Sequence, residues 1–179
     1  MQRVDVAVVG GGPAGASAGR AAARHGAEAV VIEKGVPRAD RDGPGPDSTD
    51  AAGILDYWVD IMDFDESIPE HVKHRELDAA EFIGPTETVE LTDTGFDSSY
   101  PNFGFTMHRA RFDDWLRERA EAAGAQYRVG TGVSEVETEL AGRPTHTLTL
   151  RDGTEIEASY LVLADGPQRT VTGTVLERY

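Results

Sequence analysis

The stretch VDVAVVGGGPAG, residues 4–15, decides the fold of this chain. Its first half is a short β-branched apolar run, which predicts a buried strand, and its second half is rich in glycine. The alanine-rich residues 13–25 predict a closely packed helix that ends at Gly26. Residues 29–33 are a second apolar run and predict a second buried strand. The opening is therefore a strand, a glycine turn, a helix and a strand.

Three glycines in this stretch form the pattern G-x-G-x-x-G where the predicted helix begins. Gly10 permits the tight turn, Gly12 lets the backbone approach a pyrophosphate, and Gly15 lets the helix pack on the strand. Pro13 and Ala14 complete the turn, at a helix N-terminus whose amides and dipole attract a diphosphate. We therefore expect all five residues in a dinucleotide site, against the alternative of a glycine turn that serves packing alone.

Glu33 ends the second predicted strand, where dinucleotide-binding folds place an acid. We expect its carboxylate to accept hydrogen bonds from the hydroxyls of an adenosine ribose, and to repel the 2′-phosphate of NADP. The alternative is a solvated strand-end acid beside Lys34, a residue that we also count among the cofactor-binding candidates. This fingerprint alone does not separate NAD from FAD.

The amino-acid composition of the chain limits the classes of molecule that it can bind. The 17 basic and 32 acidic side chains give a formal net charge of −15, which disfavours nucleic acid and anionic lipid surfaces. The absence of cysteine excludes disulfides, thiolate metal sites and a cysteine nucleophile. No apolar run approaches the roughly 20 residues of a transmembrane helix, and residues 4–9 do not resemble a signal peptide. We expect a cytoplasmic protein, and the scarcity of lysine beside abundant acid favours a high-salt cytoplasm, against the alternative of an ordinary acidic protein.

The remainder predicts further elements. Residues 35–50 are rich in Gly, Pro and Asp and are expected to form a loop. Residues 54–62 carry apolar side chains at helical spacing, with Ser48, Thr49 or Asp50 as the candidate N-cap, and residues 109–123 predict an amphipathic helix. Short strands are expected at 79–83, 88–91, 104–108, 126–129, 133–140, 145–150, 154–158 and 160–164. We interpret 77–107 as an antiparallel excursion and 126–158 as a small meander.

Other candidate sites are weak. His71 and His74 are expected on a solvated helix face, since no third metal ligand is evident. The acids at 60, 63, 65 and 66 lack the spacing of a calcium loop, and no Gly-x-Ser-x-Gly elbow is present. Trp58 and Trp115 are expected in the core. We therefore expect no metal site.

Three motifs together resemble one family. VDVAVVGGGPAGASAG followed by VVIEKG, then MHRARFDDWLRERAEAAGA, and finally YLVLADGPQRTV are similar to the flavoprotein monooxygenase and geranylgeranyl reductase superfamily, which shares the fold of para-hydroxybenzoate hydroxylase. Within it, the chain resembles the geranylgeranyl reductases, of a kind common in halophilic archaea. The resemblance implies an α/β Rossmann-like domain with three layers and a central parallel sheet, a small antiparallel β excursion, and FAD as cofactor.

The resemblance also implies further cofactor-binding residues. Arg109 matches an arginine that reaches the diphosphate region, a role that the neighbouring Arg111 could take instead. Asp165 and Gly166 match an Ala-Asp-Gly motif near the diphosphate and ribitol, with a plain turn as the alternative. Val133 is the remaining candidate.

We expect the cofactor domain to comprise residues 1–76 and 108–179, with 77–107 as part of a substrate domain whose remainder lies beyond Tyr179. The expected function is that of the FAD-binding domain of an oxidoreductase. Its flavin would accept a hydride from NAD(P)H or another donor and reduce a small molecule or an isoprenoid double bond. No catalytic acid or base can be named. The alternative is a non-catalytic module that binds NAD or ADP or a protein partner.

Overall fold

The computed structural model describes residues 1–37, 40, 52–64 and 68–177. Contacts divide the chain into two compact units, one formed by Met1–Gly43 with Asp113–Tyr179 and the other by Pro44–Phe112. Most of the loop expected at 35–50 lies outside the described residues, as do the candidate N-caps and the acids at 65 and 66. The functional division at 77–107 stays a prediction.

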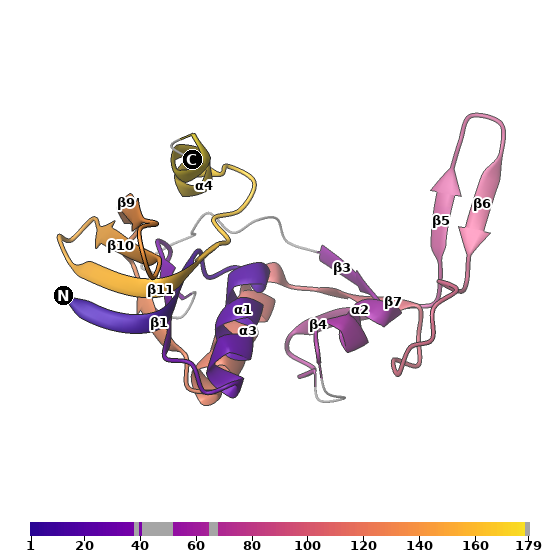
Figure 1. Ribbon diagram of the computed structural model, residues 1–179. Coiled ribbons are helices and arrows are strands. Elements are labelled where there is room, and N and C mark those ends of the chain that lie inside the picture. Colours follow the sequence, from indigo (N-terminus) through magenta and orange to yellow (C-terminus); the bar gives the residue numbers. More distant parts are fainter. Residues whose placement is uncertain (38–39, 41–51, 65–67, 178–179) are drawn as a thin grey trace. The chain divides into compact units, whose positions relative to one another are not determined.

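The first unit is built on a six-stranded sheet (Figure 1). Its strands are β1 (Gln2–Val9), β2 (Ala29–Glu33), β8 (Gln126–Val129), β9 (Val133–Glu139), β10 (Thr145–Leu150) and β11 (Glu155–Leu163), in the order β8-β2-β1-β11-β10-β9. The first four in this order are parallel, and β10 and β9 add to them antiparallel. The expected α/β class with a central parallel sheet is confirmed.

Helices cover both faces of this sheet. Side chains alternate across a strand, so Val31 of β2 faces one way while Val30 and Ile32 face the other. On the Val31 side lies α1 (Pro13–Arg24), where a Cβ on Gly19 would come within 2.6 Å of the Val31 side chain. On the other side, α4 (Thr170–Leu176) packs Val171 and Val175 against the buried apolar cluster. The sheet is therefore the middle layer of three.

The second unit has a smaller, antiparallel core. It contains β3 (Ala52–Leu55), α2 (Asp56–Ile61), β4 (Lys73–Leu77), β5 (Ala80–Ile83), β6 (Thr88–Leu91) and β7 (Gly104–Met107). Strands β3, β7 and β4 form one sheet in that order, and β5 pairs with β6 in a separate hairpin (Figure 1). Helix α3 (Arg109–Ala122) crosses the boundary between the units. Phe105 and Val72 are fully buried in this core.

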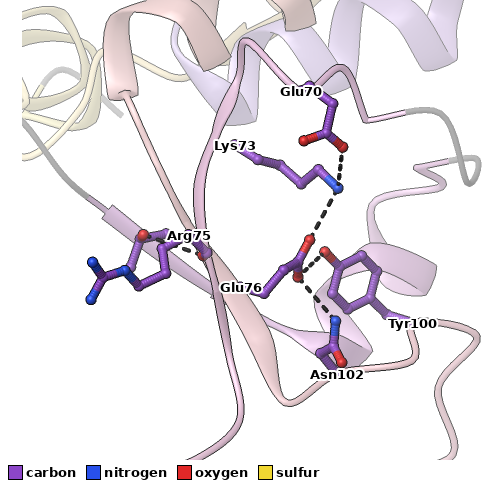
Figure 2. Close-up of polar contacts among 7 residues, drawn as sticks. Glu70, Lys73, Arg75, Glu76, Tyr100 and Asn102 are labelled. Atoms are coloured by element: carbon purple, nitrogen blue, oxygen red, sulfur yellow. Dashed lines mark hydrogen bonds and ion pairs between the residues drawn. The ribbon is translucent and has the colours of Figure 1, made fainter.

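A polar cluster holds the loop at 98–102 of this unit against β4 (Figure 2). The Glu76 carboxylate accepts hydrogen bonds from the hydroxyl of Tyr100 at 2.6 Å and the amide of Asn102 at 3.3 Å. The Lys73 ammonium lies 3.0 Å from Glu76 and 2.9 Å from Glu70. Burial raises the pKa of Glu76, but these donors outweigh that effect and hold the pKa below its ordinary value.

Several expectations for this unit were wrong. Of the helix expected at 54–62, residues 56–61 form α2, but Ile54 and Leu55 belong to β3, because residues 52–55 pair with β7 from Ala52 opposite Met107 to Leu55 opposite Gly104. Strand β4 was not expected, and it places His74 on a strand and not on a helix face. Trp58 is 43% exposed and is not a core residue.

In the first unit the expected meander was also wrong in part. Strand β8 belongs to the parallel edge of the sheet beside β2, and the two strands expected at 154–158 and 160–164 are the one strand β11, Glu155–Leu163. Helix α4 was not expected. Trp115 is buried as expected. None of the described helices is long and apolar enough to cross a membrane. Within the described ranges, no group of three or more His, Asp or Glu side chains could hold a metal ion.

Candidate functional site

The glycine turn between β1 and α1 is too tightly packed for side chains at two of its positions. A Cβ on Gly15 would press on the carbonyl group of Gly10, with the carbonyl carbon only 2.9 Å away. Gly10 itself has a φ of +98°, and a Cβ there would meet the backbone of Ala164 and Asp165. The turn is thus in direct contact with the end of β11, and both glycines are required by the backbone alone.

Gly12 differs from its two neighbours in the pattern. A Cβ at Gly12 would meet no atom of the described residues within 4 Å, and its φ of −68° is allowed for any residue. Its position is the N-cap of the 12-residue helix α1, with Pro13 in the first turn and the exposed Ala14 beside it. No described part of the chain therefore requires a glycine at this point, whereas an approaching phosphate does.

Glu33 holds the turn in place. One carboxylate oxygen accepts the amide of Gly11 at 2.6 Å, and the other accepts the amide of Gly35 at 2.7 Å. The carbonyl of Gly35 in turn accepts the amide of Gly130 at 3.0 Å. The two partner glycines were not singled out in the sequence; their position directly before Gly12 and two residues after Glu33 was the only available signal.

The strand order places the candidate residues in a row. Parallel strands present their carboxyl ends at one edge of the sheet, and the order β11-β1-β2-β8 lines up Asp165, the glycine turn, Glu33 and the 130–133 segment. Ligands of open α/β sheets bind at this edge. The edge thus offers a helix N-terminus for a diphosphate, and beside it a carboxylate at the ribose position.

Asp165 has a structural partner that was not expected. Its carboxylate accepts the amides of Val171 at 2.7 Å and Thr172 at 3.0 Å, together with the Thr172 hydroxyl, and so caps the first turn of α4. Burial raises the pKa of Asp165, but these donors outweigh burial and lower the pKa below its ordinary value. Gly166, with a φ of +78°, turns the chain away from β11. Their contact with a cofactor stays a prediction.

The remaining candidates are less clearly placed. Lys34 is exposed, and Val133 is buried in the core, so its backbone is the part left for a ligand. Arg109 opens α3 within the second unit, and its role at a diphosphate stays a prediction. Arg111, the alternative, donates to the carbonyl of His71 at 3.0 Å.

Comparison with known proteins settles the family. A family model described as an FAD binding domain matches residues 3–177. The chain belongs to this family. FAD is therefore its cofactor, and the open position at Gly12 and the carboxylate of Glu33 fit the diphosphate and the ribose of its adenosine half.

The relatives of this FAD-binding domain include reductases. A menaquinone reductase of Mycobacterium tuberculosis is 33% identical over 162 residues, which is 90% of this chain and 37% of the relative. Digeranylgeranylglycerophospholipid reductase 1 of Methanothermobacter thermautotrophicus is 28% identical over 176 residues, which is 96% and 41%. The expected relationship to geranylgeranyl reductases is confirmed.

A solved structure agrees with these relatives. A geranylgeranyl bacteriochlorophyll reductase-like protein of Thermoplasma acidophilum matches with a TM-score of 0.75 and 26% identity, over 96% of this chain and 41% of that one. The FAD-binding domain thus spans about two fifths of the length of these three relatives.

Proposed function

We propose that this chain holds the adenosine and diphosphate half of FAD in an oxidoreductase that reduces double bonds of an isoprenoid lipid. The observation that supports the FAD-binding part is the contrast within the glycine pattern. A Cβ at Gly10 or Gly15 would collide with the protein's own backbone, whereas a Cβ at Gly12 would meet none of the described atoms. The names of two relatives, which include digeranylgeranyl and geranylgeranyl reductases, support the isoprenoid substrate.

Within this proposal each group has a binding task. The first turn of α1 directs backbone amides and the positive end of the helix dipole at the diphosphate. Glu33 keeps its two amide partners and offers its remaining lone pairs to the ribose hydroxyls. A guanidinium at Arg109 would add a charge-assisted bond to phosphate.

Bound FAD supplies hydride transfer at its isoalloxazine ring. The described residues of this chain contribute placement of the cofactor, and we assign no acid or base among them. The same proposal includes NAD(P)H or another reductant as the electron donor and a cytoplasmic location. It also includes further contacts with the cofactor, made by Lys34, Val133, Asp165 and Gly166.

Two measurements test it. The purified chain is incubated with FAD and desalted, and the visible spectrum of the protein fraction is recorded; retained flavin absorption supports the proposal, and its absence with retention of ADP or NAD alone supports a nucleotide-binding module instead. The substrate is tested in cells that make an unsaturated digeranylgeranyl lipid and express the protein that contains this domain. Mass spectrometry should find lipid heavier by two hydrogen atoms for each reduced bond, and an unchanged lipid contradicts the isoprenoid assignment.

A further inference from the structure

One buried side-chain hydroxyl near the carboxyl ends of the parallel strands makes no hydrogen bond with the residues that the structure describes. Thr131 lies in the Gly130–Gly132 connection between β8 and β9, and its hydroxyl oxygen is buried. Among residues 1–37, 40, 52–64 and 68–177, this hydroxyl has no hydrogen-bond partner. A buried hydroxyl without a partner is unfavourable in a folded chain, so a ligand that supplies the partner would account for it.

The place of the 130–132 connection follows from the hydrogen bonds around Glu33. The register of β2 and β8 sets Glu33 opposite Val129, so Thr131 follows the end of β8 as Gly35 follows the end of β2. The Gly130 amide donates to the Gly35 carbonyl at 3.0 Å, and the Gly35 amide donates to Glu33. The 130–132 connection is thus hydrogen-bonded to the same segment that holds the ribose carboxylate.

If FAD runs along the sheet edge from β1 to β2, its adenine base comes next to the 130–132 connection. The diphosphate belongs at α1, which follows β1, and the ribose belongs at Glu33, which ends β2. The next strand in the order β1-β2-β8 is β8, so the base continues past Glu33 toward residues 130–133. A hydroxyl both donates and accepts, which suits the ring nitrogens and the amino group of adenine.

We propose that the Thr131 hydroxyl hydrogen-bonds the adenine base of bound FAD and contributes to the choice of adenine over other bases. The proposal rests on the adenosine half of FAD binding at this edge. It concerns a side chain that the glycine pattern and the ribose acid do not include.

The test compares Thr131→Val with Thr131→Ser by calorimetric titration with ADP and GDP. Valine has the shape of threonine without the hydroxyl, and serine keeps the hydroxyl. We expect Thr131→Val to weaken ADP binding about three- to tenfold, the loss of one neutral hydrogen bond, with a smaller preference for ADP over GDP. Thr131→Ser should retain the preference of the wild type.

Stability provides the second readout. Because the hydroxyl is buried without a hydrogen-bond partner among the described residues, Thr131→Val should have a Tm equal to or above that of the wild type without nucleotide, and a smaller rise in Tm with ADP. Tyr127→Phe is the matched control, since it removes from β8 another buried hydroxyl that has no hydrogen-bond partner within the described part of the chain. This variant should leave ADP binding unchanged.

The outcomes separate this proposal from the function itself. Wild-type affinity and base preference in Thr131→Val, with the wild type binding FAD, overturn the role of Thr131 and leave the FAD site intact. Equal weakening by Tyr127→Phe also overturns it, because the effect would then not depend on position. A wild-type chain that binds neither FAD nor ADP overturns both proposals.

Discussion

Gly15→Ala should destabilise the fold, although alanine is the better helix former. The added methyl group would press on the Gly10 carbonyl, 2.9 Å from its carbon, and lie 3.3 Å from a methyl group of Val8. Because the carbonyl is backbone and cannot rotate away, the cost is at the upper end of the range for overpacking, about 3 kcal/mol. The higher helix propensity of alanine offsets about 1 kcal/mol of this destabilisation. The net loss of about 2 kcal/mol corresponds to a fall in Tm of roughly 4–8 °C for a chain of this size.

Gly12→Ala is the matched control, because in the part of the chain that the structure describes no atom lies within 4 Å of the same methyl group there. We expect its Tm to stay within about 1 °C of the wild type, since surface changes of this kind are near neutral. Its affinity for ADP should fall at least about tenfold, because the methyl group occupies the space of the diphosphate. Differential scanning fluorimetry and calorimetric titration measure the two effects on the same samples.

The pair of variants can refute the reasoning in two ways. A Gly15→Ala chain as stable as the wild type would mean that the turn can accommodate a methyl group despite the close contacts seen in the structure. A Gly12→Ala chain that binds ADP with wild-type affinity would mean that the open position is not where the diphosphate lies.

Three further predictions concern charge. The pKa of Asp165 is lowered in the folded chain, so its ionised form stabilises the fold above the unfolded pKa, and this stability is lost as the pH falls through the folded pKa. Asp165→Asn should therefore lower Tm at pH 7. In this variant Tm should also fall less between about pH 5 and pH 2 than in the wild type. Glu76→Gln should lower Tm at pH 7, because glutamine keeps one oxygen for Tyr100 but loses the charge that pairs with Lys73. Scans of Tm against pH should show a smaller loss of stability at acid pH in the variant than in the wild type. Tm should rise with KCl because the net charge is −15 and Glu81 faces Glu90 directly in the β5–β6 hairpin; a Tm independent of salt from about 0.01 M to 1 M contradicts the high-salt interpretation.

Residues 4–33 could be interpreted from the sequence because their signals are local. An apolar run, a glycine turn and an alanine-rich helix each depend on neighbours within a few positions, and the structure has β1, α1 and β2 where these signals lie. The contacts of Glu33 could not be predicted in the same way. The proposed ribose role and the hydrogen bond with the Gly11 amide use the same carboxylate, and the direction of its oxygens follows only from the three-dimensional structure.

The elements that were missed depend on distant partners. Strand β3 is a four-residue apolar segment whose form is decided by pairing with β7. Helix α4 has the sequence TVTGTVL, in which β-branched residues and glycine disfavour helix. It forms because Asp165 caps its first turn and because Val171 and Val175 pack on the sheet. In both cases contacts with residues that are distant in the sequence outweigh the local secondary-structure propensity.

The central claim, that this chain holds the adenosine and diphosphate half of FAD, is tested most directly by titrating one preparation with FAD, ADP and FMN. We propose contacts for the diphosphate and the ribose, and we name none for the flavin ring among the described residues, so ADP should bind within about tenfold of FAD and compete with it, while FMN should not bind. FAD binding about a hundredfold tighter than ADP would mean that the chain also builds a flavin site. FMN binding that ADP does not displace would contradict the account.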